Sequence, residues 1–358
     1  MTNKLFSFYK NKDYRYVLNL LGIKISIANK NLLIKNLEKR LKDTEYLARS
    51  ATRWKLFNWA NEDKITEKEK TWFISQRFYE EVGYYPDLKN PKSFNEKINW
   101  IKLNYYNPTE KRCIDKYEFK GYIKEKLGDG YTVPLLGVYN SVDEIDFNKL
   151  PNQFVLKITT SGGGQYGIKI VKDKKTADID YIKYQLNDWL QNWMKVYYYC
   201  FAPGYKEITP RIIAEEYIEQ IDGQVYDYKF FCFHGKVQFV YVAIDHFPGV
   251  KSKITIHDKN WNKIPVEYDS HPNINKKIDK PKNFEKMIEI SEILSKDFPF
   301  VRVDFYEVKD KIYVGELTFT PGGGIGKYKP QQFDFKFGEY LDLSKIDKKY
   351  LKKEFLEV

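Results

Sequence analysis

Two carboxylates and an arginine stand inside an apolar segment late in the sequence. Residues 302–324, RVDFYEVKDKIYVGELTFTPGGG, alternate apolar and polar residues on both sides of a short polar run. This alternation predicts two antiparallel strands joined by a turn. With a three-residue loop at 309–311, Asp304 lies directly opposite Glu316.

The same pairing sets Arg302 opposite Thr318, so four polar side chains share one face of the hairpin. Two carboxylates that face each other across a strand pair destabilise it unless an opposite charge meets them. A divalent cation is the simplest such charge. The hairpin is therefore a candidate metal site built on Asp304 and Glu316.

A second signal is a lysine inside an apolar strand. Residues 153–164, QFVLKITTSGGG, predict a strand in which Val155, Lys157 and Thr159 share one face. A cation on a half-buried strand is costly unless an anion meets it. Consecutive glycines let backbone amides approach phosphate oxygens, and a serine hydroxyl adds a donor. The loop that follows the strand consists of Ser161, Gly162, Gly163 and Gly164.

The glycines alone leave two interpretations open, a phosphate-binding loop and a flexible hairpin loop. The sequence contains neither the ending of a Walker loop nor the glycine fingerprint that opens a Rossmann helix. It also contains no nucleophile elbow with histidine and acidic partners, which disfavours an acyl-enzyme hydrolase. The histidines have no metal-binding spacing; they are His234, His246, His257 and His271.

The segment AEEYIE carries Glu215 and Glu216 on a predicted strand. It is either an exposed sheet edge with charged residues or a strand whose exit offers hydrogen bonds to an adenine edge. On the next predicted strand, Asp227 and Lys229 share a face. They are interpreted as a surface ion pair of little energetic value or as part of the site.

The 358-residue chain carries 60 Lys plus Arg against 49 Asp plus Glu, a formal net charge of +11. Such a charge favours nucleotides, anionic saccharides or an anionic membrane surface as partners, although a solvated lysine-rich surface explains it equally well. No nucleic-acid-binding motif is present, so no nucleic-acid partner is expected. The three cysteines, Cys113, Cys200 and Cys232, form neither a disulfide framework nor a zinc cluster.

No apolar run is long enough to span a membrane, and no secretory signal is visible. We therefore expect a cytoplasmic protein. Residues 5–27 mix aromatic, basic and apolar positions and predict a packed helix followed by a short strand. Association of this segment with a membrane or a partner remains the alternative. Residues 28–80 predict charged helical structure.

Further helices are predicted after Pro91, where Ser93 and Glu96 form a capping-box pattern, and from Asp115 to a stop at Gly128. Helices are also predicted over residues 176–199 and after Pro281. A meander of strands is predicted over residues 210–244, with a turn at His234–Gly235.

The order of these motifs resembles the ATP-grasp superfamily, and several segments resemble its TupA-like branch, associated with teichuronopeptide and other cell-surface polysaccharide pathways. The resemblance covers roughly residues 75–345. The segments that carry it are SFNEKINW, IDKYEF, VPLLGVY, FVLK, PRIIAEEYIE, DYKFFCFHGK, FPFVRVDFY and GELTFTPGGG.

The resemblance implies an α+β, ATP-grasp fold in which two subdomains clasp ATP, preceded by a helical, basic N-terminal region. The implied division of the chain is a helical basic region at 1–74, the N-terminal part and lid subdomain at 75–210, the C-terminal subdomain with the metal site at 211–345, and a tail at 346–358.

The resemblance also implies roles for individual residues, with ATP and Mg²⁺ as cofactors. Lys116 and Lys157 resemble phosphate-binding lysines, and Ser161 to Gly164 the lid over the triphosphate. Arg302 resembles the cation that holds acylphosphate oxygens, and Lys157 supports it in catalysis. The residues implied in adenine binding are Glu215, Glu216, Tyr217 and Ile218, with Asp227 or Lys229 near the ribose or phosphates. Those implied as metal ligands are Asp304, Glu316 and Thr318.

The implied function is an ATP-dependent carboxylate–amine ligase that joins a sugar acid to an amino acid or small amine through an acylphosphate. The alternatives are a phosphotransferase or glycosyltransferase-associated enzyme acting on a surface glycan, and a nucleotide-binding scaffold of an assembly complex. Two features depart from the superfamily pattern. Thr318 stands where many members carry asparagine, and no Rossmann-like domain is visible ahead of the grasp.

Overall fold

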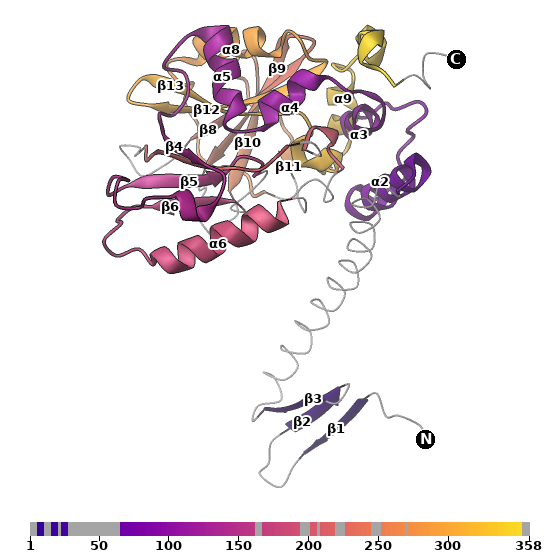
Figure 1. Cartoon of the computed structure of the whole chain (residues 1–358). Helices are drawn as coiled ribbons and strands as arrows, with labels where there is room; N and C mark the ends of the chain where they lie inside the picture. The colour runs from indigo at the N-terminus through magenta and orange to yellow at the C-terminus, as the bar shows by residue number, and fades with distance from the viewer. Residues whose placement is uncertain are drawn as a thin grey trace. The chain divides into compact units, whose positions relative to one another are not determined.

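The computed structural model describes residues 6–10, 16–20, 23–27, 65–161, 167–193, 201–205, 208–218, 226–244, 252–268 and 271–352. The chain divides into two compact units, Met1–Ile65 and Thr66–Val358 (Figure 1).

The first unit contains a three-stranded antiparallel sheet of β1 (Phe6–Lys10), β2 (Tyr16–Leu20) and β3 (Ile23–Ile27). The predicted helix followed by a short strand over residues 5–27 is therefore wrong. The sequence IKISI alternates isoleucine with polar residues, a period of two that suits a strand. Of the helical structure predicted over residues 28–80, residues 28–64 lie outside the described residues, and the remainder is helical from Glu67.

The second unit mixes helices and antiparallel strands. Its elements in chain order are α2 (Glu67–Val82), α3 (Phe94–Asn104), α4 (Pro108–Ile114), α5 (Glu118–Leu127), β4 (Leu135–Tyr139), η1 (Val142–Glu144), β5 (Phe154–Ile158), β6 (Ile168–Val171), α6 (Ile179–Asn192), η2 (Pro203–Tyr205), β7 (Ile212–Glu216), β8 (Asp227–Phe233), β9 (Lys236–Ile244), β10 (Lys253–Asp258), β11 (Glu267–Tyr268), α8 (Phe284–Ser295), β12 (Phe300–Val308), β13 (Lys311–Thr318), η3 (Pro321–Gly324), β14 (Tyr328–Lys329), α9 (Gln332–Gly338), η4 (Leu343–Lys345) and η5 (Lys348–Tyr350).

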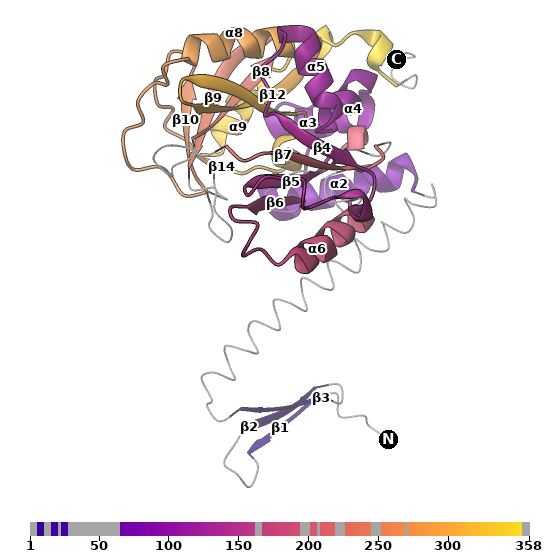
Figure 2. The ribbon, with the colours of Figure 1, turned by 60° about the vertical axis from the view of Figure 1, so that its left-hand side comes forward.

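A five-stranded antiparallel sheet in the order β10-β9-β8-β12-β13, here called the large sheet, forms the centre of this unit. Helices α5 and α8 cover one face of it (Figure 2). Aromatic and aliphatic residues of α3 and α9 pack on part of the opposite face. The rest of that face carries polar side chains.

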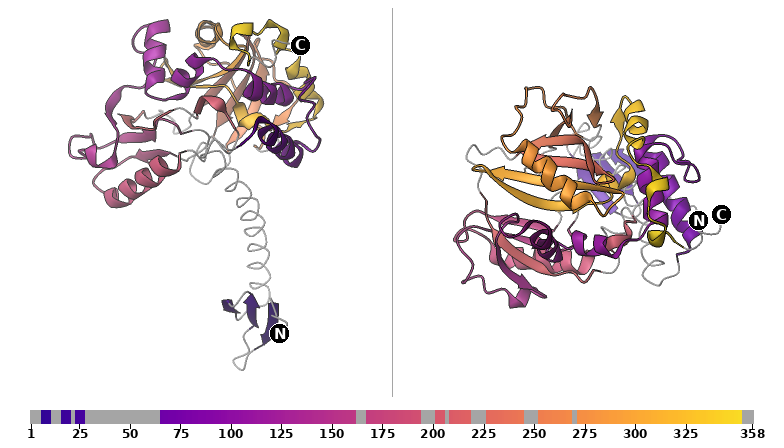
Figure 3. Two further views of the ribbon diagram at one scale, coloured as in Figure 1. Left: turned by 45° about the vertical axis from the view of Figure 1, so that its right-hand side comes forward. Right: turned by 90° about the horizontal axis from the view of Figure 1, so that it is seen from above.

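A four-stranded sheet in the order β4-β7-β5-β6, here called the small sheet, forms a second group of strands (Figure 3). Helix α6 covers one of its faces, where Leu156, Leu186 and Ala214 are buried together. The other face carries Lys157 and Glu215, because side chains alternate along β5 and β7.

The pairing does not follow the predicted domain boundaries. The boundary at 210/211 assigned β7 to the C-terminal subdomain, but β7 lies between β4 and β5 in the small sheet. The boundary at 74/75 falls inside α2. Strand pairing depends on tertiary contacts rather than on the order of strands in the chain. The order of the predicted elements therefore could not show that β7 pairs with β4 and β5. Within the described residues, no helix combines the length and the apolar character needed to cross a bilayer.

Several local predictions are confirmed. Ser93 caps α3, and Glu96 completes the capping box by accepting from the Ser93 backbone amide. Helix α5 ends at Gly128, which has a positive φ of 86°. The turn between β8 and β9 is His234–Gly235, with φ values of 48° and 76°. The predicted helix at 176–199 is observed over Ile179–Asn192.

In the β12–β13 hairpin, the predicted loop length is wrong, but the predicted pairing of Asp304 with Glu316 is confirmed. Its turn has two residues, Lys309 and Asp310, both in the left-handed region, rather than three. Asp304 nevertheless pairs with Glu316, because a β-bulge shifts the register between Asp304 and Phe305. Without this shift, Glu316 would share a face with Val314, which is buried in the apolar core.

Gly315 is the extra residue of the bulge, since Phe305 pairs with Val314 and Asp304 with Glu316. A Cβ atom at position 315 would lie 2.6 Å from Cε2 of the Tyr306 ring. A glycine at this position therefore allows both the bulge and the close approach of the aromatic ring.

We expect Gly315→Ala to lower the free energy of unfolding by about 1–3 kcal/mol, because either the Tyr306 ring or the backbone of the bulge must shift to make room for the methyl group. Gly121→Ala in α5 is the control, since its Cβ has room, with Arg112 Nη2 at 3.4 Å, and alanine favours a helix. Urea unfolding measures both changes. A Gly315→Ala protein as stable as the wild type would contradict this account of the bulge.

Candidate functional site

The large sheet brings the predicted polar residues of the hairpin together on one face. Arg302 pairs with Thr318 and Asp304 with Glu316 in the β12–β13 register, as predicted. Arg302 Nη2 donates to Glu316 Oε1 and to Thr318 Oγ1, both at 3.0 Å. Thr318 Oγ1 in turn donates to Glu316 Oε1 at 2.9 Å. The four side chains form one connected cluster.

Arg302 and Asp304 form a bidentate pair at the centre of this cluster. Arg302 Nε lies 2.6 Å from Asp304 Oδ1, and Nη2 lies 2.6 Å from Oδ2. Asp304 is 1% exposed, and burial raises its pKa although Arg302 and Lys229 act against that effect. A fork of this kind is a strong, geometrically specific way to hold a buried carboxylate.

Strand β8 adds Lys229 and Asp227 to the cluster. Lys229 Nζ donates to Asp304 Oδ2 at 2.8 Å and also to Asp227. Burial lowers the pKa of Lys229, but Asp227 and Asp304 outweigh it and raise that pKa above its ordinary value. Asp227 is 4% exposed. The interpretation of these two residues as a surface ion pair is therefore wrong, because the side chains of Lys229 and Asp227 are only 14% and 5% exposed.

Lys116 reaches the same cluster from the segment that precedes α5. Its Nζ lies 3.2 Å from Glu316 Oε2. Burial raises the pKa of Glu316, but Lys116 and Arg302 outweigh burial and hold that pKa well below its usual range. Glu316 is consequently ionised at neutral pH.

Lys116 is positioned by a contact network that sequence reasoning missed. Asp115 Oδ1 accepts from the amides of Tyr117 and Glu118, while Asp115 Oδ2 lies 3.3 Å from Arg211 Nη2. Arg211 also stacks over the Tyr117 ring at 4.6 Å and pairs with Glu118. The Lys116 amide donates to the Thr159 carbonyl at 2.9 Å, which links it to the end of β5.

The small sheet carries the second half of the site. Glu215 Oε2 lies 2.6 Å from Lys157 Nζ, and Oε1 lies 2.5 Å from Lys120 Nζ. Burial raises the pKa of Glu215, but the two lysines outweigh it and lower that pKa below its ordinary value. The interpretation of this strand as an exposed edge is wrong for Glu215, because β7 is paired on both sides.

Sequence reasoning also missed Lys120. Its signal was present, since Lys116 and Lys120 are four residues apart in the segment DKYEFK and can face the same side of a helical turn. Lys116 contacts a carboxylate of the large sheet, whereas Lys120 contacts a carboxylate of the small sheet. The start of α5 therefore links the two halves of the site.

Apolar side chains surround Lys157 on the same face of the small sheet. The register places Ile168 opposite Lys157, and Ile170 opposite Val155. Ile170 is 49% exposed, and Leu135, opposite Glu215 in the β4–β7 pairing, is 37% exposed. An exposed apolar surface beside lysines suits a flat, partly apolar anion such as a nucleotide.

The remaining predicted site residues that the structure describes lie outside the two clusters of ion pairs. Ser161 is 6% exposed, and its hydroxyl makes no hydrogen bond within the described structure. Glu216 is exposed, and Tyr217 lies under Lys172 at 6.0 Å. Tyr217 and Ile218 continue from the end of β7 and are partly exposed. The three glycines of the predicted loop, Gly162, Gly163 and Gly164, lie outside the described residues.

The described residues contain no group of three or more His, Cys, Asp or Glu side chains arranged to hold a metal. Two carboxylates and a hydroxyl, from Asp304, Glu316 and Thr318, still offer the oxygen donors that suit Mg²⁺. Both oxygens of Asp304 accept from Arg302 or Lys229. Glu316 is more accessible, with a side chain 34% exposed. The donor chemistry therefore fits a magnesium ion centred on Glu316.

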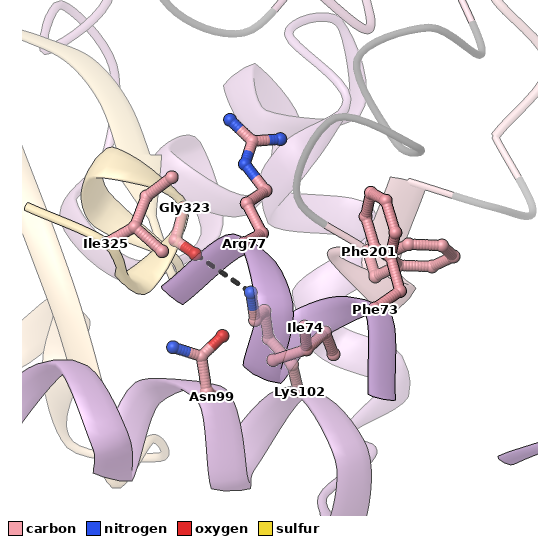
Figure 4. A pocket seen from close by; sticks show the side chains of 8 residues that line it. All are labelled: Phe73, Ile74, Arg77, Asn99, Lys102, Phe201, Gly323 and Ile325. Atoms are coloured by element: carbon pink, nitrogen blue, oxygen red, sulfur yellow. Dashed lines mark hydrogen bonds between the residues drawn. The ribbon is translucent and has the colours of Figure 1, made fainter. Parts of the chain in front are cut away.

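A small pocket lies behind the glycine turn η3, which follows β13 (Figure 4). Lys102 Nζ donates to the Gly323 carbonyl at 2.8 Å across it. The pocket contains none of the predicted site residues. Its lining residues are Phe73, Ile74, Arg77, Asn99, Lys102, Phe201, Gly323 and Ile325.

Comparison with known proteins gives one family match. The model of the family described as TupA-like ATPgrasp matches residues 96–342. No curated protein matches the chain.

Solved ATP-grasp ligases are similar over part of the chain. A D-alanine–D-alanine ligase from Bacillus anthracis is 18% identical, with a TM-score of 0.35, over 63% of this chain and 64% of that enzyme. One from Helicobacter pylori is 15% identical, with a TM-score of 0.39, over 70% of this chain and 66% of that enzyme. The D-alanyl-alanine synthetase A of Vibrio cholerae is 12% identical, with a TM-score of 0.40, over 69% and 70%. The chain thus spans just under two thirds of the first two enzymes.

We expect Glu316→Gln to lower the free energy of unfolding by about 1–2 kcal/mol at pH 7, a value already reduced for solvent screening at a partly exposed side chain. The folded-state pKa of Glu316 lies below the ordinary value of 4.5. Its stabilising effect is therefore complete above that value and disappears as the pH falls through the lowered pKa. The difference between wild type and variant should shrink on acidification, as measured by urea unfolding at pH 7 and at about pH 3.

Asp129→Asn is the control, because Asp129 pairs with Lys124 at an exposed position and contributes little at either pH. An equal difference between wild type and Glu316→Gln at both pH values would contradict the assignment of an ionised Glu316.

Proposed function

The chain belongs to the TupA-like ATP-grasp family, and from this premise we propose that it is an ADP-forming carboxylate–amine ligase. It joins a sugar acid to an amino acid or small amine during the assembly of a bacterial capsule or other cell-surface polysaccharide. The reaction takes place in the cytoplasm, where ATP is available. The sugar acid is carried by a nucleotide or a lipid, and the enzyme works at the inner face of the membrane or beside glycosyltransferases.

The observation that carries this proposal is the pairing of buried cations and carboxylates on the two sheets. Lys116, Lys229 and Arg302 meet the carboxylates of the large sheet. Lys120 and Lys157 meet Glu215 on the small sheet. Transfer of a phosphoryl group needs positive charges fixed around the phosphates, because its catalysis is mainly positioning and electrostatic stabilisation.

The nucleotide occupies the face of the small sheet that carries Lys157. The base lies on the apolar side chains around it and takes hydrogen bonds from the backbone that leaves β7, at Glu215 to Ile218. Lys157 and Lys116 bind the phosphates, and the Ser161 hydroxyl, which is free of hydrogen bonds in the described structure, is available to them.

Glu316 and Asp304 would hold a magnesium ion, and Thr318 orients Glu316 through their hydrogen bond. Magnesium supplies positive charge against the triphosphate when it is bound. The arginine fork already holds the Asp304 carboxylate, so the ligand is oriented before the ion arrives.

The substrate carboxylate attacks the γ-phosphorus, the bond to the bridging oxygen of ADP breaks, and an acylphosphate forms. Arg302 holds the oxygens of that acylphosphate. The amine then attacks the acyl carbon, inorganic phosphate leaves, and the amine loses a proton to give the amide. No enzyme nucleophile takes part in this sequence, which agrees with the absence of a nucleophile elbow in the sequence.

Trapping with hydroxylamine tests the reaction. The protein is incubated with magnesium, ATP and hydroxylamine across a panel of nucleotide-linked uronic acids, and products are identified by mass spectrometry. A hydroxamate on one panel member, with equimolar ADP, is the expected result. A stable phosphorylated sugar in its place would instead identify a phosphotransferase.

We expect Asp304→Asn to lower turnover at least about 100-fold, because an oriented negative ligand is lost from the phosphoryl-transfer site. Asparagine keeps the shape of the side chain but removes the negative charge that meets Arg302 and Lys229. Circular dichroism must therefore show that the variant is folded before its turnover is compared with that of the wild type. Asp310→Asn is the matched control on the same hairpin, at an exposed turn position with positive φ that asparagine tolerates. Normal turnover in a folded Asp304→Asn protein would rule out the metal assignment.

We expect Lys157→Met to weaken ATP binding at least about tenfold, since one phosphate-facing cation is removed. Isothermal titration calorimetry measures the affinity. Lys169→Met is the control, because Lys169 lies on the neighbouring strand opposite Leu156 and bonds to Gln185 on the α6 side. Unchanged ATP affinity in Lys157→Met would remove Lys157 from the nucleotide site.

A further inference from the structure

Two lysines share one buried carboxylate on the small sheet, but they do so unequally. Glu215 is 5% exposed and accepts from Lys120 on one oxygen and from Lys157 on the other. Lys120 Nζ also donates to the Val133 carbonyl at 2.6 Å. Within the described structure, Glu215 is the single hydrogen-bond partner of Lys157. Lys120 is therefore held at two points and Lys157 at one.

Burial separates the two lysines in the same way. The side chain of Lys120 is 13% exposed and that of Lys157 is 20% exposed. Lys157 lies on the face of the small sheet opposite α6, and Lys120 reaches Glu215 on that same face from α5. A cation that is less buried and has a single partner can exchange that partner for a phosphate at lower cost.

The net charge of Glu215, Lys120 and Lys157 determines what happens when a phosphate binds Lys157. One carboxylate and two ammonium groups leave a net charge of about +1 at this cluster. If Glu215 had Lys157 as its one partner, the pair would be neutral. An incoming phosphate would then compete with a buried carboxylate for the lysine and would leave that carboxylate uncompensated.

We propose that Lys120 is a positioning residue that permanently neutralises Glu215, so that Lys157 remains available to bind the phosphates of ATP. This inference rests on the proposed function, and it adds a role for a residue that does not itself touch the nucleotide. Lys120 acts through Glu215, and its contact with Val133 keeps it in place when Lys157 moves.

Burial lowers the pKa of Lys120 below its ordinary value, and Glu215 offsets only part of that effect by stabilising the charged form. The lysine thus depends on Glu215 for its charge, just as Glu215 depends on Lys120 once Lys157 has left.

A charge-rescue experiment tests the inference by calorimetric ATP titration of four proteins. These are the wild type, Lys120→Met, Glu215→Gln and the double variant Lys120→Met/Glu215→Gln. A unit charge about 10 Å from a phosphate, at an effective dielectric constant of about 20, changes affinity roughly tenfold. We expect Lys120→Met to bind ATP about tenfold more weakly. The double variant should return to near the wild-type affinity, because Lys157 no longer faces an unpaired carboxylate.

Two further variants separate charge from structure. Lys124→Met removes a charge one turn further along α5, where the side chain is 67% exposed, and should bind ATP like the wild type. Lys120→Arg keeps the charge and should retain most of the affinity. Melting temperatures identify any variant that fails to fold. If Lys120→Met does not fold, the ATP affinity of Lys120→Arg still tests whether the charge at position 120 is sufficient.

The outcomes distinguish this inference from the proposed function. Weak binding by the double variant as well as by Lys120→Met would overturn it and leave Lys120 a purely structural residue. Wild-type affinity in Lys120→Met, together with weak binding by Lys157→Met, would overturn it while the proposed function stands. Absence of ATP binding by the wild-type protein would overturn the proposed function itself.

Discussion

The arginine fork on Asp304 is the interaction on which the rest of the site depends. A carboxylate that is 1% exposed on the face of a sheet is tolerated only when fixed cations compensate its charge. Arg302 supplies two hydrogen bonds to it, and Lys229 supplies a third contact from the neighbouring strand. Removal of any one group would leave a buried charge uncompensated, which costs several kcal/mol. The charges on β8, β12 and β13 therefore hold one another in position.

Helix α5 extends this dependence to the small sheet. Asp115 accepts a hydrogen bond from the Glu118 amide at the start of α5 and pairs with Arg211, which immediately precedes β7. The helix start is thus tied to the small sheet by backbone and side-chain contacts, while Lys116 contacts the large sheet. A nucleotide bound between the sheets would touch groups whose positions are already coupled, so its binding energy need not be spent on ordering them.

The parts of this structure that could be predicted from the sequence are those set by local chemistry. The capping box at Ser93, the stop at Gly128 and the turn at His234–Gly235 depend on neighbours within a few residues. The pairing of the two carboxylates was also predicted correctly. That prediction assumed a three-residue loop and strands paired without a bulge. In the structure the turn is one residue shorter and Gly315 forms a bulge. A regular alternation of apolar and polar residues does not indicate such a bulge.

The missed features depend on contacts between distant segments. Lys120 acquires its role only because β7 enters the small sheet between β4 and β5. The family match supports the ATP-grasp assignment made from motif order. Neither motif order nor spacing indicates which side of a helix meets which sheet.

The bulge at Gly315 also determines how this hairpin can change in length. Removal of Gly315 would keep Val314 opposite Phe305 and Glu316 opposite Asp304, now in an uninterrupted ladder. Two chains of different length can therefore present identical carboxylate geometry. In an alignment of relatives, a one-residue gap at Gly315 is therefore compatible with the same facing pair of carboxylates.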